Sequence, residues 1–224
     1  MNYLLNLISL LVIVCPLIVN AQKSVTVGSI RYNCIHVENG GMQGYMMKSS
    51  TQVVYFGKYT TRISFTAMGG MFNTQFITNH KTESTTMLMK IPMTGKYKVK
   101  YSSDELQERR NKAPNYSITY DKKKTKEIKG YTCYYAELKT KDATITAYIT
   151  DKITPKYSPF LEMFPKLNGF PLQFDIRQGE MKLTYKADKI YDKIMKGDFK
   201  FSTKDYEEMT PAEFRKKMQD RQGK

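Results

Sequence analysis

A stretch between residues 127 and 176 constrains the fold of this chain more than any other. The segment Ala143–Thr150 alternates threonine or tyrosine with isoleucine or alanine, the period of a strand with one wet and one buried face. The segment Tyr131–Leu138 before it also has the composition of a strand, and the polar residues Lys139–Asp142 between the two predict a turn. Together these segments predict a β-hairpin.

The chain after this hairpin is interrupted by prolines. Pro155, Pro159 and Pro165 exclude both a continuing strand ladder and a long helix. The turn residues at 169–171 then precede Leu172–Ile176, which is expected to return as a strand. The stretch is therefore read as a hairpin, a crossing segment and a return strand.

Short runs with strand periodicity recur along the rest of the chain, separated by glycine-rich or charged turns. Further strands are expected at Val25–Tyr32, Gly44–Lys48, Thr51–Phe56, Tyr59–Ala67, Met71–Thr78, Thr85–Ile91, Lys96–Tyr101, Ser117–Tyr120, Met181–Tyr185 and, at an edge, Phe199–Phe201. Asp121–Lys126 is expected to be a charged turn, and Lys186–Met195 fits either a strand or a helix. Helices are expected at Ser103–Arg110 and at Pro211–Gln219, the latter after a Thr210–Glu213 capping box.

The first 21 residues predict a targeting segment. Leu4–Val19 is almost wholly apolar, and Val19-Asn20-Ala21 fits a cleavage site for export, which leaves residues 22–224 as one β-rich domain. Two alternatives stay open: an uncleaved N-terminal anchor, and lipidation at Cys15, although Val14 is larger than a lipidation site needs. The expected location is the periplasm, with association to the outer membrane as an option.

The net charge of +15 lies entirely in residues 22–224, because the first 21 residues contain no charged side chain. A basic exported protein is suited to anionic lipid headgroups or to acidic partner surfaces. Nucleic acid is not expected as a partner, because the charges are scattered along the strands and the chain is exported.

Two cysteines, Cys34 and Cys133, follow the targeting segment. An oxidising compartment permits a disulfide between them, which would close a loop of nearly a hundred residues. The alternative is two separate buried thiols that behave as small hydrophobic side chains. The sequence leaves both readings open.

The sequence contains no motif of a catalytic or cofactor-binding site. A nucleophile elbow, a phosphate-binding loop, a zinc-protease helix and a C-x-x-C pair are all absent from it. His36 can share a strand face with Cys34, but two further ligands for a metal ion are not identifiable. The expectation is a protein without enzymatic activity, cofactor or metal.

The chain contains 14 methionines, many of them on expected strands. Methionine is unbranched and polarisable, so it suits a pocket that adapts to different acyl chains; ordinary core filling and, more remotely, a Cu(I) site are the alternatives. The candidate pocket residues are Met46, Phe65, Met71, Phe76, Met87 and Met89.

Three segments resemble a known family. Ile128–Cys133 resembles an "I-x-G-Y-x-C" motif, Ala147–Ile153 a "W/Y-h-T-x-x-I" strand end, and Leu167–Leu172 an "L-x-G-h-P-h" motif. Phe199–Met218 is similar to the close of the same family, although no proline stands before Asp205 and the chain has no tryptophan. The family is that of exported Bacteroidetes proteins called DUF4412, related to GLPGLI-type proteins and, more remotely, to the lipoprotein-carrier (LolA-like) fold.

The resemblance implies a strongly curved antiparallel sheet, an incomplete barrel, with short helices over its concave face and at the C-terminus. It also implies that the concavity shelters a hydrophobic ligand, a lipid or an acylated peptide. The alternative is an accessory subunit that docks on an outer-membrane protein complex and has no ligand cavity. In that case either the basic face or the crossing segment Pro155–Pro171 would carry the contact. The candidate docking residues in this segment are Tyr157, Phe160, Phe164 and Phe170.

Overall fold

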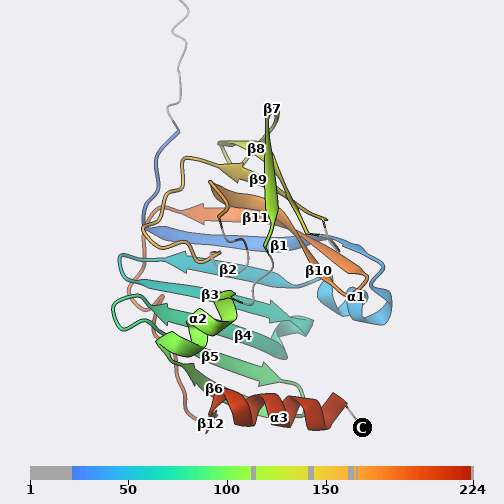
Figure 1. Ribbon diagram of the computed structural model, residues 1–224, viewed down its shortest axis with the longest axis vertical. Coiled ribbons are helices and arrows are strands. Elements are labelled where there is room, and N and C mark those ends of the chain that lie inside the picture. Colours follow the sequence, from blue (N-terminus) through green and yellow to red (C-terminus); the bar gives the residue numbers. More distant parts are fainter. Residues whose placement is uncertain (1–21, 112–114, 141–143, 161–163, 165, 223–224) are drawn as a thin grey trace, which may run out of the picture.

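The strands of the protein form one open, curved sheet. The computed structural model describes residues 22–111, 115–140, 144–160, 164 and 166–222 (Figure 1). Its 12-stranded sheet has the order β12-β6-β5-β4-β3-β2-β1-β11-β10-β9-β8-β7. The strands are β1 (Gly28–Glu38), β2 (Thr51–Phe56), β3 (Thr60–Ala67), β4 (Phe72–Asn79), β5 (Ser84–Ile91), β6 (Gly95–Tyr101), β7 (Ser117–Ile128), β8 (Tyr131–Lys139), β9 (Thr144–Thr150), β10 (Phe170–Gln178), β11 (Met181–Tyr191) and β12 (Glu207–Met209).

The sheet consists of two antiparallel meanders, β1–β6 and β7–β11, that meet where β1 pairs with β11. This pairing contains two register shifts, after Arg31 and after Cys34. Such bulges bend a strand and increase its twist, which agrees with the curvature of the sheet. The short strand β12 pairs parallel with β6 at one edge. The expected curved, mainly antiparallel sheet that does not close into a barrel is confirmed.

The described chain has three α-helices and one 3-10 turn. They are α1 (Gly41–Met47), η1 (Met68–Gly70), α2 (Ser103–Asn111) and α3 (Pro211–Gln222). Helix α2 lies over the inner, concave face of the sheet and α3 lies along β6 (Figure 1). Both expected helices are confirmed, and Thr210 and Glu213 form the expected capping box at the start of α3.

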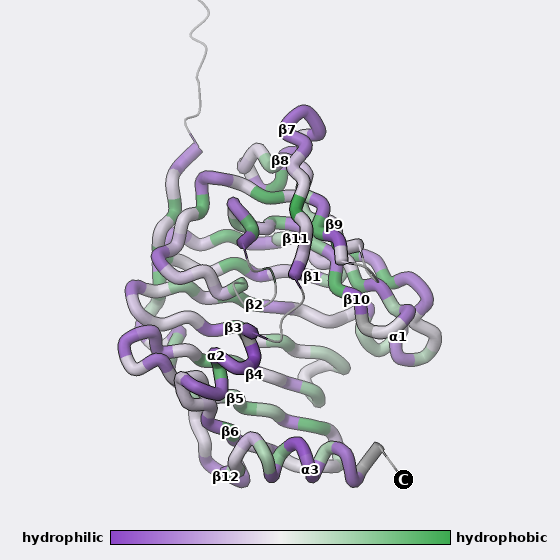
Figure 2. The backbone as a smooth tube through the Cα atoms, viewed as in Figure 1, coloured by the Kyte–Doolittle hydropathy of each residue, from purple (hydrophilic) through white to green (hydrophobic). Residues whose placement is uncertain are grey.

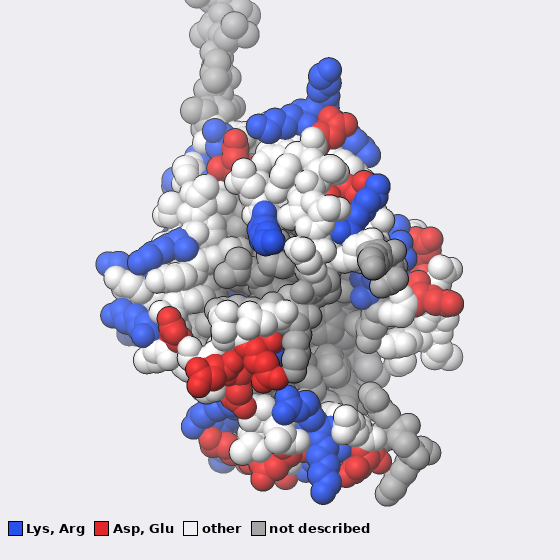
Figure 3. Space-filling model, in the orientation of Figure 1, with Lys and Arg blue, Asp and Glu red and all other residues white. Residues whose placement is uncertain are grey.

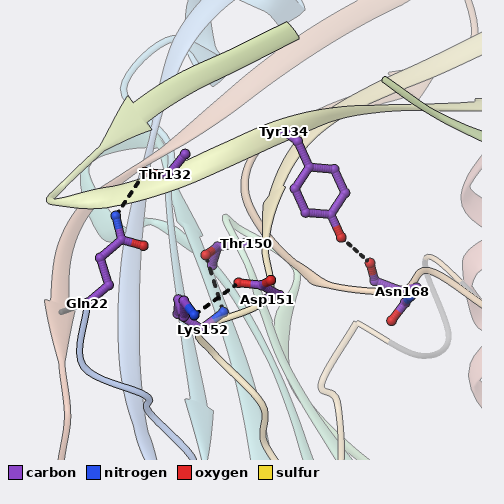
Figure 4. Close-up of polar contacts among 7 residues, drawn as sticks. All are labelled: Gln22, Thr132, Tyr134, Thr150, Asp151, Lys152 and Asn168. Carbon is purple, nitrogen blue, oxygen red and sulfur yellow. Dashed lines mark hydrogen bonds and ion pairs between the residues drawn. The ribbon is translucent and has the colours of Figure 1, made fainter. Parts of the chain in front are cut away.

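The crossing segment between β9 and β10 fills the concavity over β1, β9, β10 and β11. The ring of Phe160 is 1% exposed and lies 5.9 Å from Tyr32, 5.3 Å from Phe174 and 5.4 Å from Phe170, measured between centroids. The Oη atom of Tyr134 donates a hydrogen bond to the carbonyl oxygen of Asn168 at 3.0 Å, which ties the end of the crossing to β8 (Figure 4).

The chain between β11 and β12 passes over the outer face of the sheet. The Nη1 atom of Arg62 donates a 2.6 Å hydrogen bond to the carbonyl oxygen of Asp198, and Phe199 packs edge-on against Tyr55. This connection packs on the outer side of β2 and β3, whereas α2 lies on the inner side of the sheet.

Two expectations from the sequence are wrong, and a third is right only in part. Gly44–Lys48, expected as a strand, lies in and after α1, where Gly44 is buried against Val37. Asp121–Lys126, expected as a charged turn, lies within β7, and this expectation is right only in part. Asp121 pairs with Tyr135 and Thr125 with Tyr134, so Lys122–Lys124 bulge out of the ladder, and Asp121 Oδ1 accepts from the backbone N–H groups of Lys123 and Lys124. Phe199–Phe201 is not a strand, and the edge strand is Glu207–Met209.

The expectations for residues 1–21, which include the cleavage after Ala21 and the lipidation of Cys15, lie outside the described residues.

Candidate ligand-binding site

The inner face of β3–β6 carries two rows of side chains that oppose one another across the four strands. The first row is Ile63, Phe76, Met87 and Val99, and the second is Phe65, Thr74, Met89 and Tyr97. Residues two apart on a strand share a face, so the two rows form one continuous surface. The ring of Phe65 lies 6.5 Å from that of Tyr185, which joins this surface to the main core.

The helices cover this surface only in part. Leu106 of α2 is 2% exposed, and the ring of Phe214 in α3 lies 5.9 Å from that of Tyr97. Met87 is buried beneath this cover. The side chains of Ile63, Phe65, Phe76 and Met89, in contrast, are only half-buried. An apolar surface that includes a flexible methionine thus remains accessible on the inner face.

Two buried polar groups on the inner face have no hydrogen-bond partner among the described residues. They are Gln52 Nε2 and Thr74 Oγ1, and their residues are 2% and 6% exposed. Gln52 opposes Phe65 on one side, and Thr74 opposes it on the other. A buried polar group without a partner costs about 1–3 kcal/mol. Both atoms are enclosed by neighbouring side chains, so a bound molecule reaches them only if the half-buried side chains beside them move.

A depression of about 560 Å³ opens where the end of β6 meets the beginnings of α2 and α3. Its lining residues are Lys100, Tyr101, Ser102, Glu105, Glu208, Met209, Thr210, Pro211 and Glu213. Tyr101 connects the depression with the inner face, because its Oη atom donates to Met87 Sδ over 4.0 Å. Burial raises the pKa of Tyr101, so this hydroxyl stays protonated as a donor near neutral pH.

The carboxylates around the depression already have partners. Glu208 accepts from Lys100 and Lys98, at 2.8 and 2.9 Å, and these bonds lower its pKa to about 2. Glu105 and Glu213 cap α2 and α3 through Ser102 and Thr210. Figure 3 shows acidic side chains gathered over α2 and most lysines and arginines toward the margins of this face. The depression is therefore not a general anion site.

The structure brings together four of the six candidate pocket residues, namely Phe65, Phe76, Met87 and Met89. The other two lie elsewhere. Met46 is in α1 at one end of the sheet, and Met71 is 53% exposed at the turn between β3 and β4. Sequence reasoning missed Gln52, Tyr101 and the covering residues Leu106 and Phe214, although Leu106 is the one aliphatic side chain in its helix.

The candidate docking residues are mostly internal. Phe160, Phe164 and Phe170 are 1–2% exposed and belong to the core, so they cannot meet a partner while the fold is intact. Tyr157 is half-buried, and its ring stacks on His80 with 4.1 Å between centroids. Leu161–Met163 and Pro165 of the same segment lie outside the described residues.

Cys34 and Cys133 are free thiols, so the expected option of a disulfide is not realised. Cys34 is on β1 and Cys133 on β8, and three strands separate them in the sheet. Burial raises the pKa of Cys133 to about 12, which makes this thiol a poor nucleophile. Within the described ranges, no three histidine, cysteine or acidic side chains are grouped to hold a metal ion.

No described helix has the length and apolar character needed to span a membrane.

Comparison with known proteins gives a fold and no family. No family model matches the chain, and no curated protein matches it. Among solved structures, PNGF-II in a C2 crystal form has a TM-score of 0.50 at 13% identity, and its P21 form has 0.48 at 12%. Each similarity covers 85% of this chain and 32% of PNGF-II, so this chain spans about a third of the length of its structural neighbour. At this identity the similarity concerns the fold alone. The DUF4412 and LolA-like resemblance stays a prediction.

Proposed function

We propose that this protein binds an acyl-bearing amphiphile, a lipid or an acylated peptide, on the inner face of β3–β6. The observation that carries the proposal is the half-buried apolar surface of Ile63, Phe65, Phe76 and Met89, which the helices leave accessible. Covering such a surface with an acyl chain is favourable by about 25 cal/mol for each Å² removed from water.

The two partnerless polar groups support an amphiphile over a plain hydrocarbon. Gln52 Nε2 is a hydrogen-bond donor, and Thr74 Oγ1 is both donor and acceptor. They lie on either side of Phe65 in one row, two strands apart, or about 10 Å. An ester or amide carbonyl beside an acyl chain can accept from either group once the half-buried side chains of Phe65 and Met89 shift to admit it, whereas an alkane leaves both groups unpaired. The depression next to Tyr101 is of the size usual for small-molecule sites and offers an entrance.

The test uses the absence of tryptophan from the chain. A Phe76→Trp variant carries one indole on the inner face, and a Tyr55→Trp variant carries one on the outer face, where Tyr55 packs against Phe199. Each variant is titrated with a brominated long-chain fatty acid, which quenches indole fluorescence at short range, and with the unbrominated acid for comparison.

The proposal predicts saturable quenching of Phe76→Trp by the brominated acid and none beyond collisional quenching for Tyr55→Trp. A Thr74→Val change in the Phe76→Trp background keeps the shape and removes the hydroxyl. It is expected to weaken binding of the acid by about tenfold, the effect of one lost hydrogen bond. Equal quenching at both positions, or none at either, would refute the site.

A further inference from the structure

The turns at the two ends of the first meander differ in chemistry. Because β1 to β6 lie side by side in chain order, alternate connections emerge at the same end. One end carries α1, the β3–β4 turn and the β5–β6 turn, and the opposite end carries the β2–β3 and β4–β5 turns (Figure 1). Successive connections at one end are two strands apart, or about 10 Å.

The first end exposes large apolar side chains at each of its three connections. Met42 and Tyr45 of α1 are both 77% exposed, Met71 is 53% exposed, and Met93 at the β5–β6 turn is fully exposed. We call these four residues the methionine rim. Figure 2 shows the β3–β4 and β5–β6 turns of this end in the pale to green colours of apolar residues.

At the opposite end, the hairpin turns expose polar and charged side chains, as turns on a protein surface usually do. Its exposed tips are Lys58 in the β2–β3 turn and Lys81, Thr82 and Glu83 in the β4–β5 turn, which Figure 2 shows as hydrophilic. The ammonium groups of Lys58 and Lys81 lie 5.4 and 4.4 Å from the ring of Tyr59. One sheet therefore has polar turns at one end and apolar turns at the other.

Neither packing nor backbone conformation accounts for Met93. Its φ is +55°, and at the equivalent turn of the opposite end Glu83 has a φ of +48°. Glycine, asparagine and aspartate adopt this left-handed region at lower cost than methionine. A long apolar side chain that is fully exposed at such a position contributes little packing within the fold, and together with Met42, Tyr45 and Met71 it leaves several apolar tips at one end of the sheet available to an outside surface.

We propose that the methionine rim inserts into the surface of a bilayer that contains anionic lipids. Separate apolar tips about 10 Å apart suit a soft interface better than they suit a rigid partner surface. Tyrosine prefers the headgroup level, and a net charge of +15 favours anionic lipids. Lys48 is exposed at the end of α1, and Lys90 Nζ lies 3.4 Å from the carbonyl oxygen of Gly70 beside the rim.

The rim is continuous with the inner face of the sheet. Phe72, the residue after Met71, contacts Phe65 with 5.9 Å between ring centroids. Inserted tips would bring this end of the inner face to the bilayer surface. The proposal goes beyond ligand binding and does not depend on it, since a bilayer can be bound whether or not the inner face takes up an acyl chain.

The test is co-sedimentation of the chain from residue 22 onward with vesicles of phosphatidylcholine alone and of equimolar phosphatidylcholine and phosphatidylglycerol. The unaltered protein is expected to bind the anionic vesicles more strongly. A Met71→Ser, Met93→Ser double variant is expected to lose about a hundredfold in partition coefficient, roughly tenfold for each side chain. The matched control is Met195→Ser, because Met195 is 59% exposed and lies outside the rim.

Tryptophan fluorescence provides a second measurement of insertion, which is needed if the double variant folds poorly. A Met93→Trp variant is expected to shift its emission to shorter wavelength on anionic vesicles, and Met195→Trp is not. Absence of vesicle binding by the unaltered protein overturns the proposal, as does equal loss in the Met195→Ser control. Self-association that the double variant abolishes also overturns it and assigns the rim to a second copy of the chain. Failure here leaves the acyl-quenching result unaffected, so the two proposals are separately testable.

Discussion

Replacement of Phe160 by alanine tests whether the crossing segment is a structural plug or a surface. Its ring is 1% exposed and lies within 6.0 Å, between centroids, of the rings of Tyr32, Phe164, Phe170 and Phe174. Removing a buried phenylalanine costs about 3–5 kcal/mol, as lost transfer energy and the cavity left behind. We expect Phe160→Ala to lower the free energy of unfolding by about 4 kcal/mol. This is a large part of the 5–15 kcal/mol by which a whole domain is typically stable.

The assay is equilibrium unfolding in guanidinium chloride, followed by circular dichroism. With a slope of about 4 kcal/mol per molar denaturant, the midpoint of Phe160→Ala should fall by about 1 M. Phe201→Ala is the matched control, because Phe201 is 39% exposed and its loss should change stability by no more than about 0.5 kcal/mol. If both variants shift the midpoint equally, Phe160 does not anchor the crossing segment in the core.

Three further predictions concern a charge, a cap and the thiols. Hydrogen bonds from Lys100 and Lys98 lower the pKa of Glu208 in the folded protein from its ordinary 4.5 to about 2. The contribution of this carboxylate to stability is therefore present above pH 4.5 and lost as the pH falls toward 2, and an NMR titration midpoint of its carboxyl near 4.5 would contradict this. Thr210→Ala should destabilise the protein to heat by about 1 kcal/mol, and Thr210→Ser by only a few tenths, since serine also caps α3. Without reductant, a thiol-alkylating reagent should label Cys34 before Cys133 in the native protein, because Cys133 is buried and its pKa is raised. Both thiols should be labelled after unfolding. If neither is labelled until the protein is reduced, the two form a disulfide.

The sequence predicted elements whose periodicity comes from one buried face. The β8–β9 hairpin and the strands that carry Phe65, Phe76, Met87 and Met89 were recognisable because burial on one side forces alternation. Helix α3 was recognisable from its capping box, from Pro211 at its first position and from the shared face of Phe214 and Met218. In these elements the local sequence preference and the packing in the folded protein favour the same secondary structure.

The elements that the sequence did not predict have no local pattern that matches their structure. Strand β7 is exposed at nearly every position, so its lysines carry no alternation and resemble a loop. Helix α1 is one short run of glycine and apolar residues whose form depends on Gly44 fitting beneath Val37. The three-residue strand β12 and the cover provided by Leu106 and Phe214 arise from contacts between distant parts of the chain, which single-sequence patterns do not encode.

Native mass spectrometry of the protein purified without detergent from its own cells tests the central proposal most directly. An organic extract of the same sample identifies any released species. We expect one stoichiometric acyl-bearing molecule per chain. We also expect its loss from a Phe76→Glu variant, which places a charge among Phe65, Met87 and Met89. A control Thr86→Glu variant, altered on the opposite face of β5, should retain it. A chain that carries no acyl species, and in which Phe76→Trp shows no saturable quenching by a brominated fatty acid, would contradict the account.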